Sequence, residues 1–146
     1  MPSLTYNPEM FAFLDRLRPF SALVARLALG AIMIAHGFQK IFPKGSLYHF
    51  TQMVGHMGLP VWLGYVAAFT EFFGGVILVL GLLTPIAAAG VVIDMTVAIL
   101  KVHLRHGLTG PGGFEFPLAV FALALVVLAI GPGYLAVDAL LFRRSR

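Results

Sequence analysis

The chain contains no cysteine, and only 11% of its 146 residues are charged. The missing thiols exclude disulfides, thiol catalysis, iron–sulfur clusters and thiolate metal sites. A soluble domain usually has about a quarter of its residues charged and about half of them apolar. Here 60% are hydrophobic and the mean hydropathy is +0.94. The composition therefore predicts a protein that is folded in lipid.

The few charges are mostly positive, with ten Lys and Arg against six Asp and Glu. The basic residues stand mainly at the ends of apolar segments, which is the pattern that sets membrane topology rather than nucleic-acid binding. We therefore predict no nucleic-acid partner. We also expect no cleavable signal peptide, because residues 1–18 are mixed and polar, and the first apolar segment exceeds an h-region of about 7–15 residues.

Four segments are apolar enough, and close enough to the required 20 or so residues, to cross a hydrocarbon core of about 30 Å. They are residues 19–41, 60–82, 85–103 and 114–137. The sequence thus predicts one all-α domain over 1–146, a polytopic membrane protein built as a four-transmembrane-helix bundle. The short turn at 81–85 makes the middle spans a hairpin, so the long loops 42–59 and 104–113 should lie on one side.

Local signals refine these spans. Pro19 is well placed to start the first helix, Thr84 to cap the third, and residues 7–17 to form an interfacial helix. The side with the termini carries Arg16, Arg18, Arg143, Arg144 and Arg146, and the opposite side carries Lys40, Lys44, Lys101 and Arg105. Five positive charges against four place both termini in the cytoplasm by the positive-inside rule.

Three ionisable residues, Arg26, Glu71 and Asp94, fall deep within the predicted spans. At about 1.5 Å per residue they lie roughly 12, 16 and 15 Å from the side with the termini, in one layer. Because an unpaired charge in the membrane is costly, we expect Arg26 to pair with Glu71, Asp94 or both. The group is either a structural clamp or a polar site for a quinone head group, a proton or a small solute.

Further polar residues extend this layer toward the long loops. Arg26, His36 and Lys40 fall on one stripe of the first helix, which should face the bundle interior or a water-filled cavity. Glu71 should lie at a tight helix contact, because small residues that allow close approach surround it. These residues are Ala67, Ala68, Gly74 and Gly75.

At the mouth of the bundle, Glu115 has two readings. It favours the start of the last span through the helix dipole, or it faces His36, Lys40, His103 or His106. His36 and His103 are a conceivable axial pair for haem, but nothing in the sequence fixes them opposite one another. No metal-ligand spacing is evident, so we predict no metal site.

Six short motifs follow one another along the chain. They are Arg26-Leu-Ala-Leu-Gly30, His36-Gly-Phe-Gln-Lys40, Glu71-Phe-Phe-Gly-Gly75, Gly81-Leu-Leu-Thr84, Gly112-Gly-Phe-Glu115 and Gly131-Pro-Gly133 with Asp138. Each motif is weak by itself, but their order and spacing are fairly specific. Over residues 23–141 this succession resembles the DoxX family of bacterial and archaeal membrane proteins.

The resemblance implies a four-helix protein of the bacterial or archaeal cytoplasmic membrane. The family takes its name from a subunit associated with a terminal quinol oxidase, and with thiosulfate:quinone oxidoreduction, in thermoacidophilic archaea. Its recurring polar positions fall on Arg26, His36, Lys40, Glu71 and Glu115. Asp94 departs from the pattern, since an apolar residue is expected at its position.

The sequence therefore favours an integral membrane subunit associated with quinone-linked redox chemistry, with quinone as the one cofactor considered. The alternative is a membrane anchor, scaffold or small-solute carrier that acts as a homo-oligomer. Whether the chain catalyses a reaction by itself is left open, as is any catalytic residue. The expected partners are the lipid bilayer and a soluble or membrane oxidoreductase. The predicted polar site comprises Arg26, His36, Lys40, Glu71, Asp94, His103 and Glu115.

Overall fold

The computed structural model describes residues 12–141, and these residues form helices without any strand. The helices are α1 (Ala12–Ile41), α2 (Ser46–His56), α3 (Trp62–Leu80), α4 (Thr84–Ala98), α5 (Glu115–Ile130) and α6 (Val137–Leu141). A π-helical turn (Ile99–His103) and a 3-10 turn (Leu104–His106) extend α4.

Three helical stretches are long and apolar enough to cross a membrane: Leu14–Ile41, Trp62–Leu80 and Thr84–His106. Helix α5 is also apolar but has only 16 residues, or about 24 Å of helix. These elements confirm the predicted all-α, polytopic membrane bundle.

Several boundaries differ from the prediction. The predicted span 114–137 ends at Ile130, because Gly131 takes a positive φ of 89° and Pro132 follows it. The predicted loop 42–59 contains α2, which packs closely on α3 at Gly64, where an added Cβ would lie 2.8 Å from Thr51 Cα. The first span is longer than predicted, since α1 already includes Ala12.

Pro19 lies inside α1 rather than at its start. Residues 12–17 of the predicted interfacial helix are therefore the first turns of α1, while residues 7–11 lie outside the described part of the chain. Arg143, Arg144 and Arg146 also lie outside it.

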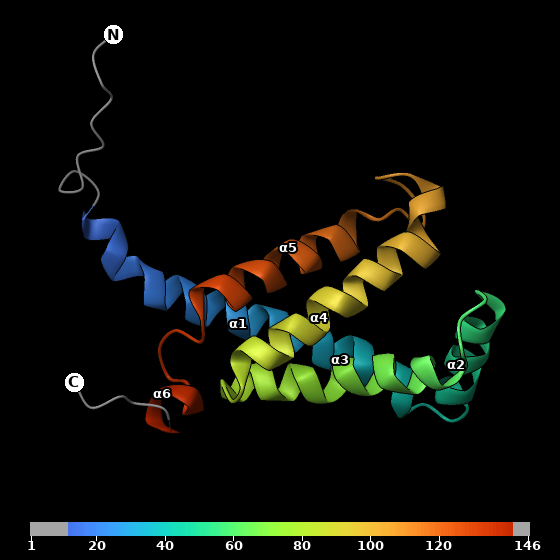
Figure 1. Ribbon diagram of the computed structural model, residues 1–146, viewed down its shortest axis with the longest axis horizontal. Helices are drawn as coiled ribbons and strands as arrows, with labels where there is room; N and C mark the ends of the chain where they lie inside the picture. Colours follow the sequence, from blue (N-terminus) through green and yellow to red (C-terminus); the bar gives the residue numbers. More distant parts are fainter. Residues whose placement is uncertain (1–11, 142–146) are drawn as a thin grey trace, which may run out of the picture.

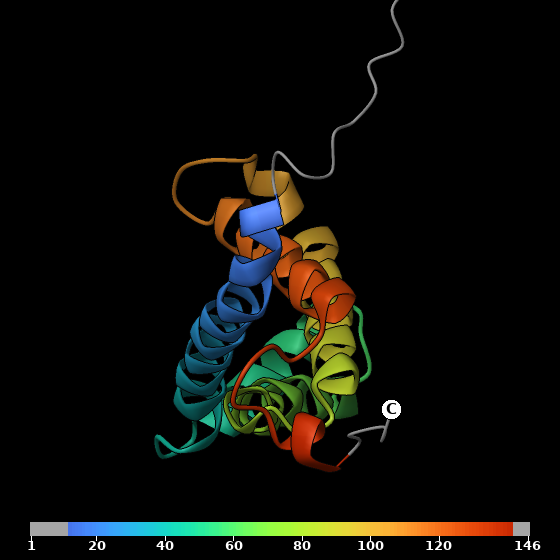
Figure 2. The same ribbon diagram turned by 90° about the vertical axis from the view of Figure 1, so that its left-hand side faces the viewer.

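The helices form two pairs, α1 with α3 and α4 with α5 (Figures 1 and 2). A core of buried apolar residues joins the pairs where they meet. Its largest fully buried members are Leu29, Met33, Leu78, Val91 and Val127. Toward the end that carries α2 and the 104–114 loop, α4 diverges from α3 (Figure 1).

Glycines bring α1 and α3 into close contact. A Cβ added to Gly75 would lie 2.7 Å from Ile34 N and 2.8 Å from Gly30 O, and one added to Gly37 would lie 2.6 Å from Phe72 Cα. Gly74 has a different environment, because a Cβ there would meet nothing within 4 Å. The tight contact predicted beside Glu71 is thus made by Gly75 and Gly37, and not by Gly74.

Candidate functional site

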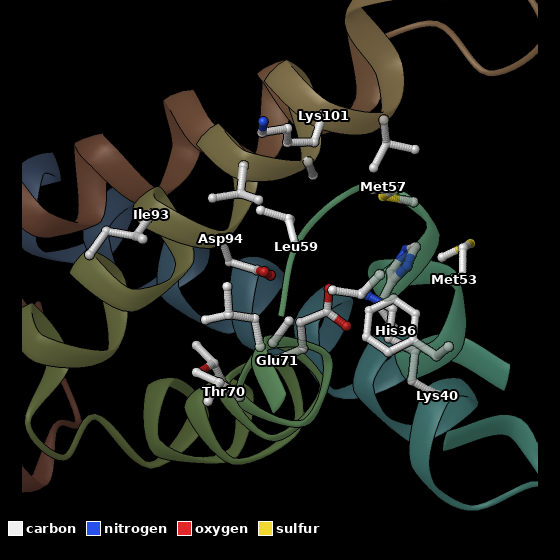
Figure 3. Close-up of a pocket in the computed structure, with 18 of the residues that line it drawn as sticks. His36, Lys40, Met53, Met57, Leu59, Thr70, Glu71, Ile93, Asp94 and Lys101 are labelled. Carbon is white, nitrogen blue, oxygen red and sulfur yellow. The ribbon is translucent and has the colours of Figure 1, made fainter. Parts of the chain in front are cut away.

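A cavity of about 630 Å³ lies between α1, α3 and α4, where the two helix pairs separate, and α2 covers part of it (Figure 3). Its lining is mostly apolar. The polar or ionisable residues among those that line it are His36, Lys40, Thr70, Glu71, Asp94, Lys101 and His103.

Helical spacing explains why these side chains converge. Residues four apart share one face of a helix. His36 and Lys40 of α1 have this spacing, as do Ala67 and Glu71 of α3, and all four residues line the cavity. On α4, Gly90, Asp94 and Ala98 likewise fall on one face and line the same space.

Lys40 and Glu71 form the central ion pair. The Glu71 side chain is only 3% exposed, and that of Lys40 is 25% exposed. The ammonium group of Lys40 also lies 4.5 Å from the centre of the Phe50 ring, a cation–π contact with α2. Only Oε1 of Glu71 is bound to Lys40. Among the described residues, buried Oε2 has no hydrogen-bond partner.

Asp94 presents a second carboxyl group to the same space. Its carboxyl points toward that of Glu71 across the cavity (Figure 3). Its Oδ2 atom is buried and, within the part of the chain that the structure describes, has no hydrogen-bond partner. Two buried carboxyl oxygens that accept no hydrogen bond from another type of side chain or from the backbone of the described residues thus lie in a largely apolar cavity. A buried polar atom without a partner is costly.

The histidines lie at the edge of this cluster. The His36 ring stacks on Phe116 of α5, with ring centres 5.2 Å apart. His103 Nδ1 is 2.7 Å from the carbonyl oxygen of Gly112, a hydrogen bond that the ring can donate. Each ring therefore packs against a different segment. No group of three or more His, Asp and Glu side chains within residues 12–141 could hold a metal ion.

Glu115 is exposed at the start of α5 and is not among the residues that line the cavity. Its backbone N–H donates to Leu108 O at 2.9 Å, which closes the 104–114 loop onto the helix. The position agrees with the first-turn role expected of a carboxylate near a helix N-terminus.

The predicted pairing of Arg26 with Glu71 or Asp94 is wrong. Arg26 is fully buried and donates only to backbone carbonyls. Its acceptors are Leu78 O at 2.7 Å, Val79 O and Pro132 O at 2.9 Å, Tyr134 O at 3.2 Å and Leu135 O at 3.3 Å. Arg26 lies in the first span, as predicted, but its partners include carbonyls that are left unpaired at a helix end, and the sequence does not reveal these partners.

Asp138 completes this second polar cluster, and sequence reasoning assigned it no role. Its carboxylate accepts hydrogen bonds from Leu83 N at 2.6 Å and Thr84 N at 2.8 Å, so it caps α4. The prediction that Thr84 caps this helix is wrong, because its hydroxyl has no partner among the described residues. The only sequence signal was the position of Asp138 just after the Gly131-Pro132-Gly133 break.

The chain has apolar spans, a buried polar cluster at one end and a cavity with buried carboxyl groups toward the other. These features define a small polytopic membrane protein with an intramembrane polar site. Comparison with protein families matches residues 21–104 to DoxX. The chain belongs to the DoxX family.

A curated relative shows what this chain resembles over most of its length. The chain is 30% identical over 125 residues to a protein of Bacillus subtilis (strain 168) named "Putative oxidoreductase CatD". The match covers 85% of this chain and 89% of that protein. No solved structure matches the chain.

Proposed function

We propose that this chain is the membrane subunit of a quinone-linked oxidoreductase and that its cavity binds the head group of a quinone or quinol. One observation carries the proposal: the unsatisfied buried oxygens of Glu71 and Asp94 line an otherwise apolar cavity. Small-molecule sites typically have about 300–1,000 Å³ and a few placed polar groups among apolar walls. A bound polar head group would satisfy these oxygens.

The chemistry of the lining suits this class of ligand. A quinol hydroxyl can donate a hydrogen bond to a carboxylate, and a quinone carbonyl can accept one from Lys40 or from a protonated carboxyl. Oxidation of a quinol to a quinone releases two protons and two electrons, and the carboxyl groups can accept protons. Intramembrane acids serve as proton relays in other membrane proteins.

The electrons would pass to a flavin, haem or metal centre of a partner oxidoreductase. This assignment agrees with the lack of cysteine ligands in the chain. The name of the Bacillus subtilis relative also points to redox chemistry. We further propose that the protein lies in the cytoplasmic membrane with the end that carries Arg16, Arg18 and α6 facing the cytoplasm. The positive-inside rule favours this orientation, because the three arginines that follow α6 in the sequence bring the basic residues on that side to five, against four on the other.

The test is to purify the chain in mild detergent and identify bound small molecules by mass spectrometry. Asp94→Asn removes one carboxylate while keeping the side-chain shape. Asp15→Asn is the matched control, because Asp15 is exposed and lies near the start of α1, whereas the α1 residues that line the cavity are His36 and Lys40. Wild type and Asp15→Asn should carry a quinone, and its content should fall about tenfold in Asp94→Asn, the effect of about 1.4 kcal/mol.

Wild-type protein without quinone, or an equal content in Asp94→Asn, would contradict the proposal. If the empty protein instead captured an oxidoreductase, the chain would be a membrane anchor. Uptake of a solute by liposomes that contain this chain alone would favour a carrier.

A further inference from the structure

Helices α3 and α4 touch near their shared turn and again at Gly90. A Cβ added to Gly90 would lie 3.2 Å from Thr70 Cγ2, so the two helices are in contact at this level. Farther from the turn they separate, and the cavity begins (Figures 1 and 3). The contact between Gly90 and Thr70 therefore forms one end of a gap between these helices.

The edges of this gap are apolar and exposed. Val66 on α3 is 50% exposed, and Ile93 and Val97 on α4 are 66% and 41% exposed, although all three line the cavity. We call the gap between these three side chains the α3–α4 opening. Ile93 follows Thr84 by nine residues, or about 14 Å of helix, which is near the middle of a hydrocarbon core of about 30 Å. The opening thus faces lipid tails.

Polarity changes from the inside of the cavity to this opening. Inside lie the buried carboxyl groups of Glu71 and Asp94, whereas the exposed side chains of Val66, Ile93 and Val97 at the opening are aliphatic. On the side toward the long loops, Phe50 and Met53 of α2 line the cavity. The shape and polarity suit an amphiphile whose polar head lies inside and whose apolar tail points into the bilayer.

We propose that the ligand enters from the bilayer between α3 and α4, and that its tail stays in the α3–α4 opening while its head contacts Glu71 and Asp94. The inference rests on the proposed quinone site and adds its route of access and the need for a tail. The occupant is therefore a membrane-dissolved amphiphile rather than a water-soluble aromatic compound.

The experiment uses the full chain in lipid nanodiscs and two probes, a decyl-substituted benzoquinone and its methyl analogue. Binding is measured by calorimetric titration, with empty nanodiscs as the background. Ile93→Trp places a bulky ring in the opening. Ile86→Trp is its matched control, because Ile86 lies two turns earlier on the same face of α4, is 69% exposed and does not line the cavity.

We expect wild type and Ile86→Trp to bind the decyl probe more tightly than the methyl probe. Ile93→Trp should weaken binding of the decyl probe about tenfold and change binding of the methyl probe less than about twofold. Thermal unfolding checks that each variant is folded. Val97→Trp, one turn farther along the opening, replaces Ile93→Trp if that variant is unfolded.

Unchanged binding of the decyl probe in the folded variant would overturn the route between α3 and α4. An equal loss for both probes would also overturn the inference, because the tryptophan would then obstruct the head-group site and the tail would not lie in the opening. If wild type binds neither probe, the proposed quinone site itself fails.

Discussion

The molecule buries charged groups in two places. The two places differ in whether the hydrogen bonds of these groups are satisfied. Near the termini, Arg26 donates five hydrogen bonds to carbonyls, and both carboxylate oxygens of Asp138 accept backbone N–H groups. In the cavity, Glu71 and Asp94 each keep one buried oxygen without a partner among the described residues. Satisfied buried polar groups rigidify a structure, whereas unsatisfied ones call for another explanation.

The first cluster has a structural explanation. Arg26 binds carbonyls at the end of α3 and in the segment after α5, and Asp138 binds amides at the start of α4. The backbone N–H of Asp138 also donates to Gly81 O at 2.9 Å. The cluster thus holds the C-terminal segment against the α3–α4 turn. The guanidinium of Arg26 and both carboxylate oxygens of Asp138 already have hydrogen-bond partners, which is why we place the site in the cavity.

The comparison predicts its largest effect at Arg26. Arg26→Ala should lower the free energy of unfolding by at least about 3 kcal/mol, because it removes several hydrogen bonds from a charged donor and leaves buried carbonyls unpaired. Thermal unfolding in detergent measures this change. Arg18→Ala is the control on the same helix, since Arg18 is exposed in a surface ion pair with Asp15. Similar melting temperatures for both variants would contradict the structural role.

The second prediction separates the correct ion pair from the one that the sequence suggested. A double-mutant cycle of Lys40→Met and Glu71→Gln should show a coupling energy of about 1–3 kcal/mol, because the two side chains form a partly buried ion pair. The matched cycle uses Lys101→Met with Glu71→Gln. Lys101 also lines the cavity, but no ion pair with Glu71 is present, so coupling should stay below about 0.5 kcal/mol. Equal coupling in both cycles would contradict the pairing.

These two predictions also mark what could be read from the sequence. Apolar run lengths predicted the membrane bundle, because the demand for internal hydrogen bonding in lipid leaves few alternatives to helices. Five of the seven predicted polar residues line the cavity, namely His36, Lys40, Glu71, Asp94 and His103, whereas Arg26 and Glu115 do not. They were noticed because an ionisable group in or near a span is rare. What the sequence could not reveal was which charges share a partner, because depth along a helix does not determine the direction around it.

Arg26 and α2 illustrate this limit. Arg26 lies only a few ångströms in predicted depth from Glu71, yet it is bound to helix ends and a returning segment whose position depends on the tertiary fold. Helix α2 lies in a stretch with mixed polarity, and it is held by packing against α3, with Thr51 and Val54 buried. Such contacts depend on tertiary packing and cannot be inferred from the hydropathy of each span taken by itself.

A third prediction concerns the cap on α4. Asp138→Asn should lower the free energy of unfolding by about 1–2 kcal/mol, since an amide has one oxygen for two N–H donors and loses the charge that favours a helix N-terminus. Asp15→Asn, the same change at an exposed position, should leave the melting temperature nearly unchanged. If the two variants have the same melting temperature, the cap contributes nothing to stability and the first cluster depends on Arg26 alone.

The smallest effect on stability should come from a substitution of Asp94. This variant tests most directly whether the two clusters have different roles. Asp94→Asn should change the free energy of unfolding by less than about 0.5 kcal/mol or increase it, because an unsatisfied carboxyl contributes little to stability. Quinone content should nevertheless fall. Unfolding and bound ligand are measured on the same preparation, after removal of free quinone. A loss of stability as large as that of Asp138→Asn would mean that Asp94 has a structural partner, and the distinction between the two clusters would no longer hold.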